Sequence, residues 1–289
     1  MKGYFEVAVG MAACVAAVVV VATRPVVAAQ APPAAGAVPY TPSRTAGGQP
    51  DLSGIWQYIG PATFDLEDHS PSMGVPAGYG VVDGGRIPYL PAALKQRDKN
   101  FQDRATADPT EAFCYRPGVP RITLMPFPFQ ILQFPNYTEI VYEFLGVNRQ
   151  LFFKGQHPDP DIDTFWMGDS RAHWEGKTLV VDVANFNDET WFDGAGNFHS
   201  DALHVVERYT RTSPDIMTYE VTIEDPKVFS RPWKMRVPLY RRQEPNLRLL
   251  EYQCHTYMEE EAAKGHAKLP WSHLPLEGVP PFEGVPEKK

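Results

Sequence analysis

Residues 203–224 read LHVVERYTRTSPDIMTYEVTIE and decide the fold class of this chain. From 217 to 224, apolar and polar side chains alternate at every position. Successive side chains of a strand point to opposite faces, so this alternation predicts a strand with one buried face. The turn signal Ser213-Pro214-Asp215 separates it from another β-rich run at 203–211. The stretch therefore predicts a β-hairpin.

Three further hairpins are predicted in the same half of the chain, with strand pairs at 139–144 and 149–154, 164–174 and 178–184, and 233–242 and 247–255. Successive hairpins with short turns predict an antiparallel up-and-down meander rather than a parallel α/β sheet. Because open sheet edges promote aggregation, we expect an all-β fold that closes into a lipocalin-like β-barrel, with at least six antiparallel strands in residues 139–255.

Outside the meander, we expect one short helix at 92–104, directly after Pro91. The proline-dense stretch 109–135 is expected to wrap the surface, because proline is confined to the edges and turns of sheets.

The amino terminus predicts export. Lys2, the apolar run 8–22 and the small residues Val27-Ala28-Ala29 have the layout of a signal peptide over residues 1–29. An uncleaved anchor, or a lipoprotein modified at Cys14, are the alternatives. A flexible leader (30–50), a single β-rich domain (51–258) and a Pro-rich tail (259–289) would follow. We expect a periplasmic or secreted protein with no membrane span in its mature chain.

Charge and cysteine content limit the function classes. The formal net charge of −8 argues against nucleic acid or an anionic membrane surface as a partner. Cys114 and Cys254 remain after signal cleavage and predict one disulfide in an oxidising compartment, with two buried free thiols as the alternative. The sequence contains no Cys-x-x-Cys, P-loop or Rossmann glycine motif, so we expect no cofactor.

Gly54-Ile55-Trp56 resembles the Gly-x-Trp that opens lipocalin-type barrels. Three longer motifs resemble a family of exported bacterial proteins of unassigned function that are described as lipocalin-like, namely CYRPGVPR (114–121), GDSRAHWEGKTLVVDVANFND (168–188) and GNFHSDALHVVERYTR (196–211). The resemblance extends from about Pro50 to His255 and implies export and a β-rich fold, but no reaction. Relatives tend to carry Leu-Pro-Pro after the cysteine, where this chain has Tyr-Arg-Pro.

The densest polar cluster is HSDALH, which contains His199, Asp201 and His204. A histidine exchanges protons near neutral pH, and a nearby carboxylate orients its ring, so these three are the candidate catalytic residues. Strand alternation places His204 and Arg208 on one face. If that face is the barrel interior, both line a cavity mouth; otherwise Leu203, Val205 and Tyr209 fill the interior and His204 points outward.

A second cluster supplies candidate ligand-binding residues, namely Asp169, Arg171, Arg208, Trp166 and Trp191. We expect the catalytic candidates to converge with Asp169 or Arg171 at a cavity mouth. An outer face of cross-strand ion pairs is the alternative. A serine hydrolase built on Ser170 or Ser200 is disfavoured because neither serine lies in a Gly-x-Ser-x-Gly elbow.

The segment HPDPDID, with His157, Asp159, Asp161 and Asp163, has the donor types of a cation site. It fails the EF-hand spacing, so an acidic solvated turn is favoured and no metal site is predicted.

Three functions fit these features. The first is a barrel that binds a small apolar or aromatic molecule whose identity the sequence does not reveal. The second is an enzyme on the same scaffold that performs His/Asp acid–base chemistry of the lyase, hydratase or isomerase type. The third is a structural envelope protein. An apolar pocket would favour binding, converging His and carboxylate groups the enzyme, and a filled barrel the structural role.

Overall fold

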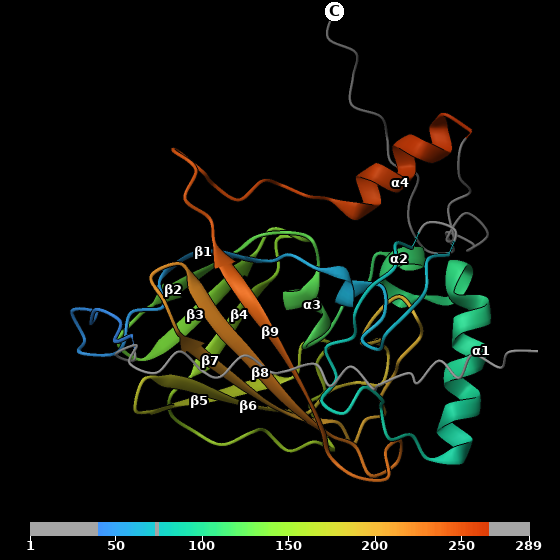
Figure 1. Ribbon diagram of the computed structural model, residues 1–289, viewed down its shortest axis with the longest axis horizontal. Helices are drawn as coiled ribbons and strands as arrows, with labels where there is room; N and C mark the ends of the chain where they lie inside the picture. The colour runs from blue at the N-terminus through green and yellow to red at the C-terminus, as the bar shows by residue number, and fades with distance from the viewer. Residues whose placement is uncertain (1–39, 73–74, 266–289) are drawn as a thin grey trace, which may run out of the picture. The chain divides into compact units, whose positions relative to one another are not determined.

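The computed structural model describes residues 40–72 and 75–265, all of which belong to one compact unit (Figure 1). The predicted signal peptide, residues 30–39 of the leader and residues 266–289 of the tail lie outside the described residues. Residues 40–50 contact the barrel, because Lys177 Nζ donates to the Tyr40 carbonyl at 2.9 Å. None of the described helices is long and apolar enough to cross a membrane.

Nine strands form one closed barrel in chain order, and this confirms the predicted all-β barrel. They are β1 (Gly54–Tyr58), β2 (Phe129–Gln133), β3 (Tyr137–Tyr142), β4 (Asn148–Phe152), β5 (Asp169–Glu175), β6 (Thr178–Ala184), β7 (His204–Arg211), β8 (Ile216–Glu224) and β9 (Trp233–Arg241). All neighbours pair antiparallel except β4 and β5, which pair in parallel. The barrel closes where β1 pairs with β9, as Figure 1 shows.

Two sequence predictions about the strands are wrong. Residues 247–255 do not pair with β9, because β1 and β8 already occupy both of its edges. The proline-dense stretch 109–135 does contribute a barrel strand, β2, because its prolines at 128 and 135 flank the strand and leave its own N–H groups free to pair.

The predicted helix at 92–104 is confirmed as the core of the longest described helix, which starts at a proline that needs no N–H partner. The structure adds short helices that the sequence did not predict. The helices are η1 (Pro61–Thr63), α1 (Pro91–Ala107), α2 (Pro109–Phe113), α3 (Arg121–Leu124) and α4 (Cys254–Ala263). Asn100 ties α1 to the loop before β7 by donating to the Gly196 carbonyl at 3.1 Å.

Side chains fill the barrel interior. Along β7, β8 and β9 the burial pattern alternates, and all of the inward-facing positions are buried. Trp56 of β1 is fully buried, and the guanidinium groups of Arg211 and Arg241 lie 5.7 and 5.8 Å from its ring centre. The interior between these strands is therefore a packed core.

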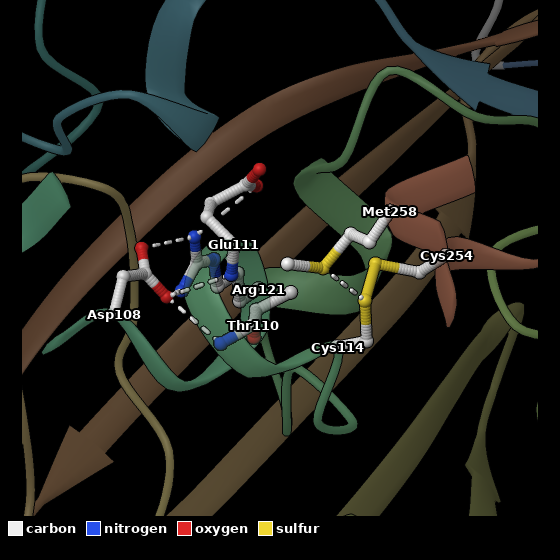
Figure 2. Close-up of a disulfide and its surroundings, with 7 residues drawn as sticks. All are labelled: Asp108, Thr110, Glu111, Cys114, Arg121, Cys254 and Met258. Carbon is white, nitrogen blue, oxygen red and sulfur yellow. Dashed lines mark hydrogen bonds and ion pairs between the residues drawn. A yellow bond between two sulfur atoms is a disulfide. The ribbon is translucent and has the colours of Figure 1, made fainter. Parts of the chain in front are cut away.

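The predicted Cys114–Cys254 disulfide is present, with the two Cα atoms 5.6 Å apart, and it joins α4 to α2 (Figure 2). Beside it, the buried Arg121 donates two hydrogen bonds of 2.8 Å to Asp108, which also caps α2 through the Thr110 N–H. Figure 2 shows that this ion pair and the disulfide anchor the same short helix from two sides.

Candidate functional site

The barrel is weakest at the seam between β4 and β5. These two strands share a single parallel bridge, Phe152 opposite Arg171, whereas β5 and β6 stay in register from Asp169–Ala184 to Glu175–Thr178. Residues 153–168 link the two strands, because a parallel pair cannot be joined by a tight hairpin turn. Side chains, rather than a continuous backbone ladder, therefore close the barrel here.

A cleft of about 430 Å³ opens at this seam, and we call it the seam cleft. Its walls come from the outer face of β3 and β4, from residues 164–168 and from the first residues of β5. Arg116, from the loop after α2, completes the lining. The volume lies within the range of pockets that hold small organic molecules.

Aromatic side chains form one wall of the seam cleft. Trp166 lies edge-to-face against Tyr115, with ring centres 4.9 Å apart, and Tyr115 stacks on Phe113. Phe152 and Phe165 also line the cleft and are 37% and 40% exposed. Exposed aromatic rings gathered around one concavity are typical of surfaces that bind a planar or apolar molecule.

The floor of the seam cleft leads to a buried polar network in the barrel interior. Ser170 accepts a hydrogen bond of 3.0 Å from Arg149 Nε, and so joins β5 to β4. Arg149 forms a bidentate ion pair with Glu207, and the hydroxyls of Tyr209 and Tyr219 donate to Glu207 Oε1 at 2.9 and 2.7 Å. All five side chains are buried.

Burial governs the protonation of this network. It raises the pKa of Tyr209 and Tyr219 well above the ordinary value, and the charge of Glu207 raises both further. The phenols therefore stay protonated and donate to the carboxylate. Glu207 receives bonds from three residues, as a buried charge requires.

The rim of the seam cleft is charged. Arg116 is exposed, Glu139 is half-buried, and neither forms an ion pair with another residue of the described part of the chain. Asp169, also on the rim, is engaged by Arg171 through bonds of 2.6 and 2.9 Å. The free cation and the free carboxylate are available to a bound polar group.

A second polar network runs along the outer face of the sheet next to the cleft. His157 bridges two carboxylates, with Nδ1 2.7 Å from Asp169 and Nε2 2.7 Å from Asp182. His204 Nε2 lies 3.0 Å from the other oxygen of Asp182. Partial burial acts to raise the pKa of Asp182, but the hydrogen bonds from His157 and His204 outweigh it, and the pKa is lowered.

The predicted catalytic residues do not converge. His199 is buried, and its Nε2 lies 2.6 Å from the Thr190 hydroxyl. Asp201 is exposed and pairs with Lys227. His204 faces outward, which is the second of the two arrangements that strand alternation left open. The reason is strand register, because Val205 and Tyr209 occupy the inward positions of β7.

The predicted ligand-binding residues divide between the seam cleft and other places. Trp166 and Asp169 line the cleft. Arg171 is not part of the lining but donates a hydrogen bond to Asp169. Arg208 lies on the outer face and pairs with Glu175 at 2.7 Å, so it does not line the cleft. Trp191 is buried in the loop before β7 and does not line the cleft.

The acidic segment 157–163 forms a turn. Asp159 accepts a hydrogen bond from the Asp161 N–H, while His157 points to the sheet and binds Asp169 and Asp182. Within residues 40–72 and 75–265, no three acidic, histidine or cysteine side chains are arranged to hold a metal ion.

Sequence reasoning missed Arg116, Arg149 and Glu207. Glu207 belongs to the same HSDALHVVERY motif as the predicted histidines. Basic residues at 149 and 211 stand on strand faces next to apolar positions and could have signalled a buried partner.

Comparison with known proteins assigns no family: no protein-family model matches the chain, and no curated protein matches it significantly. The resemblance to exported lipocalin-like proteins therefore stays a prediction.

Proposed function

We propose that this protein is exported and binds a small apolar or aromatic molecule in the seam cleft. The observation that carries the proposal is the aromatic wall of Trp166, Phe165 and Phe152 beside a polar floor at Ser170. Such pockets bury an apolar body and orient it through a few polar groups. The Cys114–Cys254 disulfide supports export, because disulfides persist in oxidising compartments.

The seam geometry supports the same conclusion. Ser170 accepts from Arg149, so its own hydroxyl proton is directed elsewhere, and no acceptor for it occurs among the described residues. A ligand oxygen or nitrogen at the cleft floor would accept this proton. The rings would hold the ligand body while Ser170 fixes its orientation.

The test is a fluorescence titration of the full chain with the neutral aromatic probe N-phenyl-1-naphthylamine. Replacing Trp166→Ala should weaken probe binding by about tenfold, because a buried aromatic anchor carries a large part of such an affinity. The matched control Ile59→Ala removes an exposed apolar side chain outside the cleft and should leave the affinity unchanged. Equal affinity in the Trp166→Ala variant and the parent chain would refute the assignment.

A structural envelope role is the second candidate, and the packed interior is the observation that favours it. If the protein has this structural role, no small aromatic probe should bind the folded chain. The same titration therefore separates the two functions.

A further inference from the structure

A second pocket, of about 300 Å³, lies between α1, the segment after η1 and the loop before β7, and we call it the α1 pocket. It shares no lining residue with the seam cleft. The loop reaches it because Asn100 of α1 holds the Gly196 carbonyl.

One face of α1 presents two arginines to this pocket. Arg97, Phe101 and Arg104 are four and three residues apart, so they share a helix face. The guanidinium carbons of Arg97 and Arg104 lie 5.4 and 4.2 Å from the centre of the Phe101 ring. The ring therefore holds both cations in place beside the pocket.

The charge of Arg104 has no carboxylate partner among the described residues. Its Nη1 donates only to the Phe101 carbonyl, at 2.5 Å. Arg97, by contrast, is engaged by Asp65 at 3.5 Å and by the Asn197 side chain at 3.3 Å. Asp65 is the one acidic residue among the described residues that line the pocket, so the lining carries excess positive charge.

His69 supplies a second unsatisfied group. Its Nδ1 lies 3.0 Å from the Glu67 carbonyl oxygen. A carbonyl only accepts, so Nδ1 carries the proton. The other nitrogen, Nε2, is buried and has no hydrogen-bond partner in the described part of the protein. A buried polar atom without a partner is destabilising, and a bound group would relieve that cost.

Apolar side chains complete the α1 pocket. Phe64 and Phe101 line it, and Phe101 is 38% exposed. Among the described residues, the pocket thus combines a guanidinium without a carboxylate partner, an imidazole nitrogen without a hydrogen-bond partner and an apolar wall. Guanidinium groups match carboxylate and phosphate oxygens in charge and shape.

We propose that the α1 pocket binds a small anion through Arg104 and His69, with a carboxylate or phosphate as the charged group. The anion's oxygens accept from Arg104, and His69 Nε2 accepts from a hydroxyl group of the ligand where it has one, as hydrogen phosphate does. An apolar body, where the ligand has one, packs on Phe64 and Phe101. This site is independent of the seam cleft.

Isothermal titration calorimetry of the full chain with inorganic phosphate, and separately with benzoate, tests the proposal. At least one anion should bind; phosphate alone or benzoate alone would each support the site and identify its charged group. Arg104→Gln should weaken binding by about tenfold or more, because it removes a charge-assisted hydrogen bond. His69→Gln should weaken phosphate binding less, since the glutamine side chain keeps an acceptor oxygen.

Two controls make the result specific. Arg231→Gln removes an exposed arginine outside the pocket and should bind the anion as the parent chain does. Trp166→Ala should also bind it normally, which separates this site from the seam cleft. Absence of binding by both anions, or equal binding by the Arg104→Gln variant with a native circular dichroism spectrum, would overturn the proposal.

Discussion

The two faces of β7 carry polar networks that differ in their access to water. On the inner face, Glu207 is fully buried and bound by Arg149, Tyr209 and Tyr219. On the outer face, the side chains of His204 and Arg208 are 38% and 37% exposed and pair with carboxylates across the sheet. Both networks contain ion pairs with short distances.

Because of this difference, ion pairs of similar geometry on the two faces should contribute unequally to the free energy of unfolding. Water screens the outer pairs, so each contributes little to stability. The inner pair is buried away from water, and removing one partner leaves an uncompensated charge in the core. We therefore assign a structural role to the inner network and expect the outer network to tolerate substitution.

The largest expected effect is from Arg149→Met. This variant leaves Glu207 buried without its cation, and we expect a loss of about 3–5 kcal/mol in the free energy of unfolding. The matched outer variant, Arg208→Met, should lose less than about 1 kcal/mol. Urea unfolding measures the free energy of unfolding of both variants. Equal losses would contradict the proposed difference between the inner and outer networks.

A double variant sharpens this result. Arg149→Met combined with Glu207→Leu removes both buried charges and should recover much of the stability that Arg149→Met loses, because apolar side chains can replace a buried ion pair. If the double variant is less stable than either single variant, then Arg149 and Glu207 stabilise the fold through more than neutralising each other's charge.

Alkaline pH should destabilise the protein through the inner tyrosines. Tyr209 and Tyr219 ionise near 10.0 when unfolded, but burial raises the pKa of both in the folded chain. Above pH 10 the unfolded state therefore binds fewer protons, and stability falls as pH rises, by up to about 1.4 kcal/mol per pH unit for each tyrosine. Unfolding free energies between pH 9 and 11, compared with a Tyr209→Phe/Tyr219→Phe variant, should show a smaller pH slope in the variant.

The buried His199 should cause a smaller loss in the free energy of unfolding at acidic pH. Burial lowers its pKa from 6.5, so below pH 6.5 the unfolded state takes up a proton that the folded state refuses. This contribution to stability is present above pH 6.5 and is lost as pH falls, by at most about 1.4 kcal/mol per pH unit. NMR titration of the His199 ring should find its pKa below 6.5; a pKa at or above 6.5 would contradict its buried placement.

The smallest expected effect is from His204→Ala. An exposed histidine of the outer network should change the free energy of unfolding by under about 0.5 kcal/mol. A loss above about 2 kcal/mol in thermal or urea unfolding would place His204 among the groups that hold the fold.

The sequence predicted the strands of β7 and β8 because alternation is local. It did not predict which face of β7 is inside, since both faces carry charged or polar side chains, among them His204 and Arg208 on one and Glu207 and Arg211 on the other. Inside the barrel, the cation that neutralises Glu207 is Arg149, which is 58 residues away in the sequence. Periodicity contains no such long-range information.

The closing strand and the candidate site also depend on contacts between segments that are far apart in the sequence, so local patterns did not predict them. β1 closes the barrel by pairing with β9, far along the chain, and no local pattern reports that partner. Trp166 and Asp169 were predicted as ligand-binding residues, but the seam cleft depends on the parallel β4–β5 pair, which the predicted hairpins did not include.

The most direct test of the binding account is to map the probe on the folded chain by NMR. Amide chemical shifts should be recorded as N-phenyl-1-naphthylamine is added to isotope-labelled protein. A ligand in the seam cleft should shift signals of residues 148–152 and 164–170 and leave those of β8 and β9 unchanged. Shifts concentrated on the inward-facing residues of β8 and β9 would instead place the ligand inside the barrel and contradict the packed core.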